Sequence, residues 1–205
     1  NSVGKFVDWC TSNFLELNMS KTKELTIDFR SNPGPAVPIV LNGQIIEQVT
    51  SIRYLGLVID NKLSFTDHVN TVQKKCQQQL YVLRRLRSFN LDSKLLLLLY
   101  RSIVEPLLTY CNICYFTMLS VTNRNKLQKI ASVASKIVGL PTLLISHLCD
   151  RAILRKASVI ADDSRHPLNR YFDLLPSGRR YRCIKCQKSR FRKSFLPTAL
   201  RMLNE

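Results

Sequence analysis

The sequence predicts an α+β fold, in which an N-terminal helix and a small antiparallel sheet are followed by an all-α bundle and a basic tail. Three observations support this class. Residues 22–29 alternate apolar and polar side chains, which is the period of a half-buried strand. Residues 65–161 repeat apolar side chains three and four positions apart, as helices do. Residues 179–193 hold eight basic side chains and no acidic one.

The composition limits the classes of partner and compartment. The chain has 205 residues and 45% apolar content, enough for one or two small globular units. Its net charge of +17 indicates a polyanionic partner, above all nucleic acid, although a solvated basic surface is the alternative. The first residues lack a secretory signal, and Arg101, Glu105 and Pro106 interrupt the longest apolar stretch. We therefore expect a nuclear or cytoplasmic protein that is not secreted and keeps its seven cysteines reduced.

The N-terminal elements follow from local patterns. An amphipathic helix is predicted over residues 2–17, ending at Asn18, and a strand over residues 22–29 after it. Residues 31–35 form a loop, and Asn42-Gly43 predicts a two-residue hairpin turn, because such turns need two positive φ angles. Another buried strand follows, with a glycine at its centre that marks a close approach by a ligand or another backbone: Leu55, Gly56, Leu57, Val58 and Ile59.

The second half is predicted to be helical. Ser64 is the expected N-cap of a first helix, and Asp92 begins the next. Pro106 should kink a central, fully buried helix near Ile103. Further helices are expected at residues 95–115, 123–138, 143–161 and 195–203, and the second of these should stop at Gly139. A loop is expected at residues 162–176.

Several runs of residues resemble one protein family. WCTSNFLELNMSKTKEL (9–25), the hairpin, and RYLGLVIDNKLSFTDHV (53–69) are similar to the segment downstream of the catalytic centre in reverse transcriptases of non-LTR (LINE-like) retrotransposons. Later runs, such as LYVLRRLRSFNL (80–91), resemble the thumb and C-terminal tail of that family, so the resemblance covers nearly the whole chain. It implies a palm remnant with a primer-grip hairpin at 1–62, a thumb-like helical domain at 63–161, and a basic C-terminal tail with a short helix at 162–205.

The resemblance also implies an activity and its partners. The chain would be the C-terminal portion of an RNA-directed DNA polymerase, and its partners would be an RNA and DNA primer–template hybrid and an upstream fingers–palm segment, with no membrane. The family's metal-binding aspartates lie in a Phe/Tyr-Ala-Asp-Asp motif upstream of Trp9, so we expect an inactive fragment. No cofactor is expected in this chain, and magnesium only in a complete polymerase.

Specific residues take roles from the same resemblance. Lys21 corresponds to a lysine proposed to protonate the leaving pyrophosphate, and a solvated lysine is the alternative. Tyr54, Leu55 and Gly56 correspond to the primer grip, and an ordinary core strand is the alternative.

Two basic clusters are the expected nucleic-acid contacts. One lies on the first helix of the bundle and the other in the tail, where Tyr181 and Phe191 would stack on bases. Solvated faces or a nuclear-localisation signal are the alternatives. The predicted contact residues are Lys74, Lys75, Arg84, Arg85, Arg87, Arg179, Arg180, Arg182, Lys185, Lys188, Arg190, Arg192 and Lys193.

Other motifs are interpreted as structural. Ala161-Asp162-Asp163 should be the end of a helix and not a catalytic motif, because no apolar strands flank it. Cys111 and Cys114 should pack as small apolar residues, and Cys183 and Cys186 lie in a basic run, so no metal site is expected.

A catalytically inactive nucleic-acid-binding or scaffold remnant is the alternative function. The segment QKKCQQQLYVLRRLRSFNL (73–91) is also similar to a short helical region at the N-terminus of AlkB-type tRNA-modifying dioxygenases. The chain carries no His-x-Asp…His iron motif of such an enzyme, so this similarity implies no dioxygenase activity.

Overall fold

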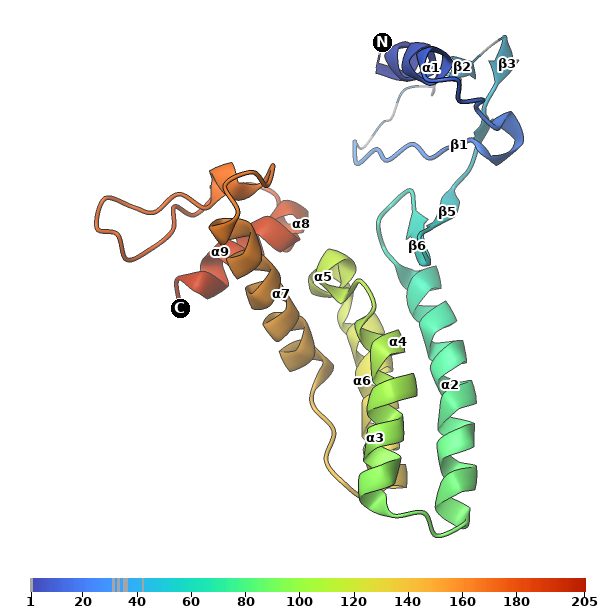
Figure 1. Cartoon of the computed structure of the whole chain (residues 1–205), viewed down its shortest axis with the longest axis vertical. Helices are drawn as coiled ribbons and strands as arrows, with labels where there is room; N and C mark the ends of the chain where they lie inside the picture. Colours follow the sequence, from blue (N-terminus) through green and yellow to red (C-terminus); the bar gives the residue numbers. More distant parts are fainter. Residues whose placement is uncertain (1, 31, 33, 35–36, 42) are drawn as a thin grey trace. The chain divides into compact units, whose positions relative to one another are not determined.

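The computed structural model describes residues 2–30, 32, 34, 37–41 and 43–205 (Figure 1). The chain divides into an N-terminal unit, Asn1–Asp67, and a helical unit, His68–Glu205. Helices and small sheets together agree with the predicted α+β class. The predicted functional regions 1–62, 63–161 and 162–205 stay a prediction.

The first helix is shorter than the sequence pattern indicates. Helix α1 covers Ser2–Ser12 and ends five residues before the predicted Leu17. Phe14 adopts a left-handed conformation with φ of 56°, and Leu15 N donates to Cys10 O at 2.9 Å, which closes the helix end. Asn18, the predicted stop, instead caps the short 3-10 helix η1 (Met19–Lys21), where its Oδ1 accepts from Lys21 N at 3.2 Å.

The predicted strand over residues 22–29 is mostly wrong. Only β1 (Lys23–Glu24) is a strand, and it pairs in parallel with β4 (Glu47–Gln48). A strand is held by the backbone of its partner, and β4 offers two residues. Beyond this pair Ile27 and Phe29 are exposed, although the alternation predicted a buried face.

Two antiparallel hairpins follow. In the first, β2 (Val40–Leu41) pairs with β3 (Gln44–Ile45), and Gly43 has φ of 75°, so the predicted hairpin is confirmed. Asn42 of that turn lies outside the described residues, as do Ser31, Pro33 and Pro35 of the predicted loop. Among the described residues the strands form three two-stranded sheets rather than one antiparallel sheet.

The second hairpin corrects the position of Gly56. Strand β5 (Ser51–Tyr54) pairs with β6 (Leu57–Asp60), and Leu55 and Gly56 form the two-residue turn between them, with φ of 46° and 86°. Both turn residues have positive φ, as a type I′ turn requires. Gly56 is therefore a turn residue and not the centre of a buried strand.

Asp60 organises the chain where β6 ends. Its carboxylate accepts hydrogen bonds from the backbone amides of Lys62 at 3.0 Å, Ser64 at 3.0 Å and Phe65 at 2.8 Å. Ser64, the predicted N-cap, accepts from Thr66 N at 3.3 Å. Burial raises the pKa of Asp60, but the three amides and the Ser64 hydroxyl outweigh it and leave this pKa below its ordinary value.

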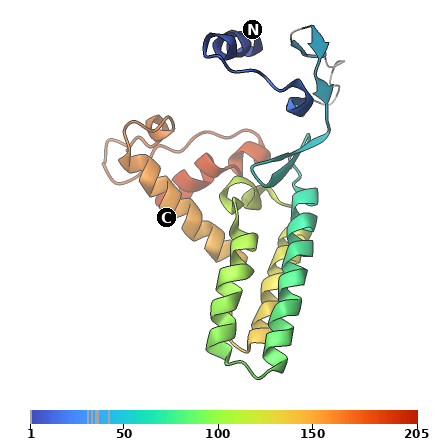
Figure 2. The same cartoon turned by 45° about the vertical axis from the view of Figure 1, so that its right-hand side comes forward.

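Three long helices pack along one another in the helical unit. Helices α2 (Thr66–Ser88), α3 (Ser93–Ile103) and α6 (Val121–Val138) lie side by side in both views (Figures 1 and 2). The predicted α2 stripe is confirmed in the interior, since Val69, Cys76 and Leu83 are fully buried. Asp92 caps α3 and Gly139 ends α6 with φ of 78°, as predicted.

The predicted helix over residues 95–115 is broken into three. After α3 come α4 (Glu105–Thr109) and α5 (Asn112–Tyr115), so the break near Ile103 is confirmed and continuity is not. Pro106 lies in the first turn of α4, and Cys111 takes a left-handed conformation with φ of 51°. Nor is the segment buried all round, because Leu95 and Leu98 are exposed.

The last helices pack on each other. Helix α7 (Ile145–Asp162) contacts α4, α5 and α9 (Phe195–Leu203). Asp162 ends α7 and Asp163 caps it, which confirms that Ala161-Asp162-Asp163 is a helix terminus. The remaining short helices are η2 (Phe116–Met118), η3 (Asn169–Tyr171) and α8 (Ser189–Arg192). No helix in the described part of the chain is long and apolar enough to cross a membrane.

Candidate nucleic-acid interface

A basic groove lies between α2 and α6. It holds about 270 Å³ and is lined by Arg84 of α2 and by Lys126 and Lys129 of α6. Its floor is apolar, with Leu80, Ile130 and Val133, and Gln73 and Gln77 supply amide groups. Within the described residues no acidic side chain lines this α2/α6 groove.

One of these cations is held in place. Lys126 Nζ donates a hydrogen bond to Asn70 Oδ1 on α2 at 3.0 Å, across the two helices. Asn70 is neutral, so the ammonium keeps its charge available for an anion. Cations above an apolar floor are suited to a nucleic-acid backbone, because phosphates meet the charges and sugars meet the floor.

The basic residues predicted on α2 do not form one surface. All five are exposed, but among the described lining residues Arg84 alone belongs to the groove. Lys74 and Arg85 are about three turns apart, opposite the buried stripe. The Arg85 guanidinium lies 5.7 Å from the Phe89 ring, and Arg87 Nη1 donates to Ser93 Oγ at 3.1 Å.

Sequence reasoning missed Lys126 and Lys129. They lie one turn apart beside the buried residues of α6, a spacing that is visible in the sequence. Their meeting with Arg84 depends on how α6 packs against α2, which no local pattern records. The α6 lysines are also fewer than the tail cations and are separated by Leu127 and Gln128, so they form no obvious run.

The predicted basic tail is folded against α9. Tyr181 N donates to Asn204 Oδ1 at 2.7 Å, and Asn204 Nδ2 donates back to Tyr181 O at 3.0 Å. Leu175 N donates to Arg180 O at 2.7 Å, which closes a short loop. All eight predicted tail cations are exposed: Arg179, Arg180, Arg182, Lys185, Lys188, Arg190, Arg192 and Lys193.

The two tail aromatics differ in their surroundings. Tyr181 packs edge-on against Phe172, with ring centroids 6.0 Å apart, and is half-buried. Its ring is thus part of the packing of the tail. Phe191 in α8 is exposed, and base stacking by these two rings stays a prediction.

The residues predicted for the primer end lie in the N-terminal unit. Tyr54 is 61% exposed and Leu55 is 74% exposed at the tip of the β5–β6 hairpin, so neither packs in a core of this chain. Lys21 is exposed at the end of η1, while its neighbour Lys23 forms an ion pair with Glu47. The roles predicted for Lys21, Tyr54, Leu55 and Gly56 remain predictions.

The cysteines differ in their surroundings. Burial raises the pKa of Cys76 and of Cys149 to about 12, which keeps both thiols neutral. Cys114 is exposed and does not pack as predicted, because α5 begins only after Cys111 and turns that side outward. Within the described ranges no three His, Cys, Asp or Glu side chains are grouped to hold a metal ion.

Comparison with curated proteins finds mobile-element polymerases. The RNA-directed DNA polymerase from mobile element jockey of Drosophila funebris is 25% identical over 181 residues, covering 84% of this chain and 19% of that protein. The probable RNA-directed DNA polymerase from transposon BS of Drosophila melanogaster is 26% identical over 132 residues, covering 63% of this chain and 14% of that protein. The chain therefore spans less than a fifth of each of these relatives.

A third mobile-element polymerase and one protein family are also similar to the chain. The probable RNA-directed DNA polymerase from transposon X-element of Drosophila melanogaster is 20% identical, covering 91% of this chain and 20% of that protein. The family described as "Alkylated DNA repair protein alkB homolog 8, N-terminal" matches residues 65–106, which hold α2, α3 and the start of α4. No solved structure matches the chain.

Proposed function

We propose that this chain, whose homologues are the RNA-directed DNA polymerases of non-LTR retrotransposons, is the part of such a polymerase that holds the primer–template hybrid. The observation that carries the proposal is the α2/α6 groove, where Arg84, Lys126 and Lys129 converge. Contacts to phosphates are independent of sequence, as a polymerase requires when it moves along any template.

The β5–β6 hairpin would contact the primer end. Its tip presents the exposed Tyr54 ring and the Leu55 side chain, while the tight turn at Gly56 fixes their direction. An exposed aromatic ring can stack on a terminal base. Replacing Tyr54 by alanine in an active polymerase that contains this chain should lower primer extension and leave the melting temperature nearly unchanged.

An upstream fingers–palm segment is the proposed partner of the N-terminal unit. Many of its apolar side chains are exposed, including Phe14 at 99%, Val37 at 84% and Ile45 at 71%. Exposed apolar side chains in such number are typical of a surface that another segment covers. The neighbouring segment of a polymerase palm would cover them by extending the short sheets.

The isolated chain should not polymerise nucleotides. Phosphoryl transfer requires metal ions held by carboxylates to stabilise the developing charge, and we expect those carboxylates and their magnesium in the upstream segment. Lys21 would then serve as the general acid only in the complete polymerase. Primer extension by the 205-residue chain alone would contradict this part of the proposal.

A catalytically inactive nucleic-acid-binding or scaffold protein is the second candidate. The match of residues 65–106 to the alkB homolog 8 N-terminal family supports it, because that match covers α2, α3 and the start of α4 and includes no predicted polymerase site except the α2 cations. A scaffold of this kind would bind nucleic acid without supporting primer extension when joined to an upstream segment.

Lysine footprinting tests the central contact. The chain would be acetylated with and without an RNA–DNA hybrid, and each lysine quantified by mass spectrometry. The hybrid should protect Lys126 and Lys129, whereas Lys136, exposed on the same helix but outside the groove, is the matched control. Equal protection of all three lysines would mean that binding is diffuse, and the groove would lose its role.

A further inference from the structure

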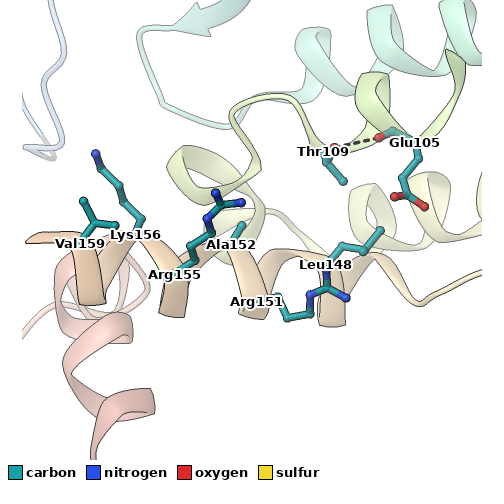
Figure 3. A pocket seen from close by; sticks show the side chains of 8 residues that line it. All are labelled: Glu105, Thr109, Leu148, Arg151, Ala152, Arg155, Lys156 and Val159. Atoms are coloured by element: carbon teal, nitrogen blue, oxygen red, sulfur yellow. Dashed lines mark hydrogen bonds between the residues drawn. The ribbon is translucent and has the colours of Figure 1, made fainter. Parts of the chain in front are cut away.

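A second basic concavity lies between α4 and α7, apart from every residue discussed above for nucleic-acid contact. Figure 3 shows this α4/α7 cleft, with Arg151, Arg155 and Lys156 rising from α7 and Glu105 on the α4 side. We propose that the α4/α7 cleft binds a single strand of nucleic acid through its phosphates, at a site separate from the α2/α6 groove.

The positions along α7 give the cleft two kinds of surface. Leu148, Ala152 and Val159 are spaced by turns of the helix and form an apolar stripe. Arg151 and Arg155 flank it one turn apart, which places them about 6 Å apart along the axis. A strand that lies along α7 can therefore meet successive phosphates with arginines and its sugars with the stripe.

The three cations, Arg151, Arg155 and Lys156, are exposed and form no ion pair with the described residues. Two arginines one turn apart repel each other, and an anion between them removes that repulsion. Guanidinium groups also present paired donors that match phosphate oxygens.

The size of the cleft is suited to part of a single strand. It holds about 440 Å³, within the range of sites that enclose a ligand of nucleotide size. Because α4 and α7 form opposite walls, a single strand can enter between them.

Glu105 makes the two walls of the cleft opposite in charge. Its carboxylate stands on the α4 wall, and Thr109 Oγ1 donates to the Glu105 backbone oxygen at 2.9 Å (Figure 3). A carboxylate repels phosphate, so the backbone of the strand should follow the α7 wall. Removing this charge without changing its shape should tighten binding, an effect opposite to that of removing the arginines.

The test measures binding of the full chain to a labelled oligouridylate and to an RNA–DNA hybrid of equal length at several salt concentrations. For the single strand, Arg151→Gln with Arg155→Gln should reduce the slope of log K against log salt by about 1.4, since each phosphate contact contributes about 0.7. Hybrid binding should keep its slope. Glu105→Gln should raise the single-strand affinity.

A matched control distinguishes binding at the α4/α7 cleft from nonspecific attraction to the positive charge of the chain. Lys94→Gln with Arg101→Gln also removes two exposed charges, from α3, and should leave the single-strand slope unchanged. An equal loss with the control, an equal loss for the hybrid, or no effect of Glu105→Gln would overturn the proposal. Stronger competition by an acidic peptide than by unlabelled oligouridylate would assign the cleft to a protein and would also overturn the proposal.

The α2/α6 groove is intact in all these variants. Failure of the proposed hybrid binding would therefore appear separately, as weak hybrid binding by the unmodified chain.

Discussion

The two units of the chain use apolar residues in opposite ways. In the helical unit, large side chains such as Tyr100, Leu108 and Leu127 are buried to 1% exposure or less. In the N-terminal unit, Phe14 and Val37 are almost fully exposed, and strand pairs are two to four residues long. Both units have apolar sequences, so the difference lies in whether the side chains find partners within the chain.

This difference is informative about function. A helix satisfies its backbone hydrogen bonds internally and needs only one packed face, so four or more helices can form a core by themselves. A strand needs neighbouring strands on its edges, and a short hairpin is marginally stable alone. The helical unit should therefore act as a stable support for the basic surfaces, while the N-terminal unit should depend on a partner.

Truncation of a large apolar side chain should show the greatest difference in stability between the two units. Leu83→Ala in α2, at a fully buried position, should lower the free energy of unfolding by about 2 to 5 kcal/mol. Phe14→Ala, at 99% exposure, should change it by less than about 0.5 kcal/mol. Urea denaturation followed by circular dichroism measures both. Similar losses for both variants would mean that the N-terminal unit has a core of its own.

Within the N-terminal unit, the turn at Gly56 should be the sensitive position. Valine at φ of 86° is strained, so Gly56→Val should destabilise the β5–β6 hairpin by about 1 to 3 kcal/mol. Asparagine tolerates positive φ better and is the control. Hydrogen exchange of the cross-strand amides would compare the two variants, and equal protection would exclude strain as the cause. Gly56→Val therefore perturbs folding, and Tyr54→Ala is the better probe of primer contact.

The helical unit should lose stability on mild acidification. His68 is buried, and burial together with the positive charge of Lys75 lowers its pKa. The unfolded chain then binds a proton more readily near the ordinary pKa of about 6.5, so stability falls as the pH drops below that value. The melting temperature should decrease from pH 7 to pH 5.5.

A phenylalanine at this position provides the control. His68→Phe keeps a ring against Tyr115, which lies 4.8 Å from the His68 ring centroid, and removes the titrating group. Its melting temperature should vary less over the same pH range. An unchanged pH dependence in His68→Phe would assign the effect to other groups.

Acidification should lower the stability of the N-terminal unit only at a lower pH, and by a smaller amount. The pKa of Asp60 is below its ordinary value of about 3.9, so its contribution is complete above that pH and is lost as the pH falls through the lower folded pKa. The amide resonances of Ser64 and Phe65 should shift in this range, and Asp60→Asn should abolish the shift. A shift centred near pH 6.5 would contradict this account of the turn.

The parts of the fold that the sequence predicts are those with local signals. Asp92 begins α3 and Gly139 ends α6, because a cap and a positive φ are properties of one or two residues. The buried stripe of α2 follows from its period alone. The β2–β3 hairpin was likewise predictable, since glycine supports its tight turn.

The wrong predictions concern features that no local sequence pattern determines. The predicted strand over residues 22–29 is mostly wrong because β4 offers only two residues to pair with. The predicted continuous helix over residues 95–115 is wrong at Cys111, whose left-handed conformation has no local signature. The α2 cations could be identified, but Arg84 could not be separated from the others, nor joined to Lys126 and Lys129. That grouping arises from packing between helices.

The α2/α6 groove is proposed to hold the phosphates of the hybrid. The most direct test is the salt dependence of hybrid binding for the unmodified chain and for Arg84→Gln, Lys126→Gln and Lys129→Gln combined. Loss of three phosphate contacts should reduce the slope of log K against log salt by about 2.7, at about 0.9 for each contact. An unchanged slope in the triple variant would show that the hybrid does not bind in the α2/α6 groove.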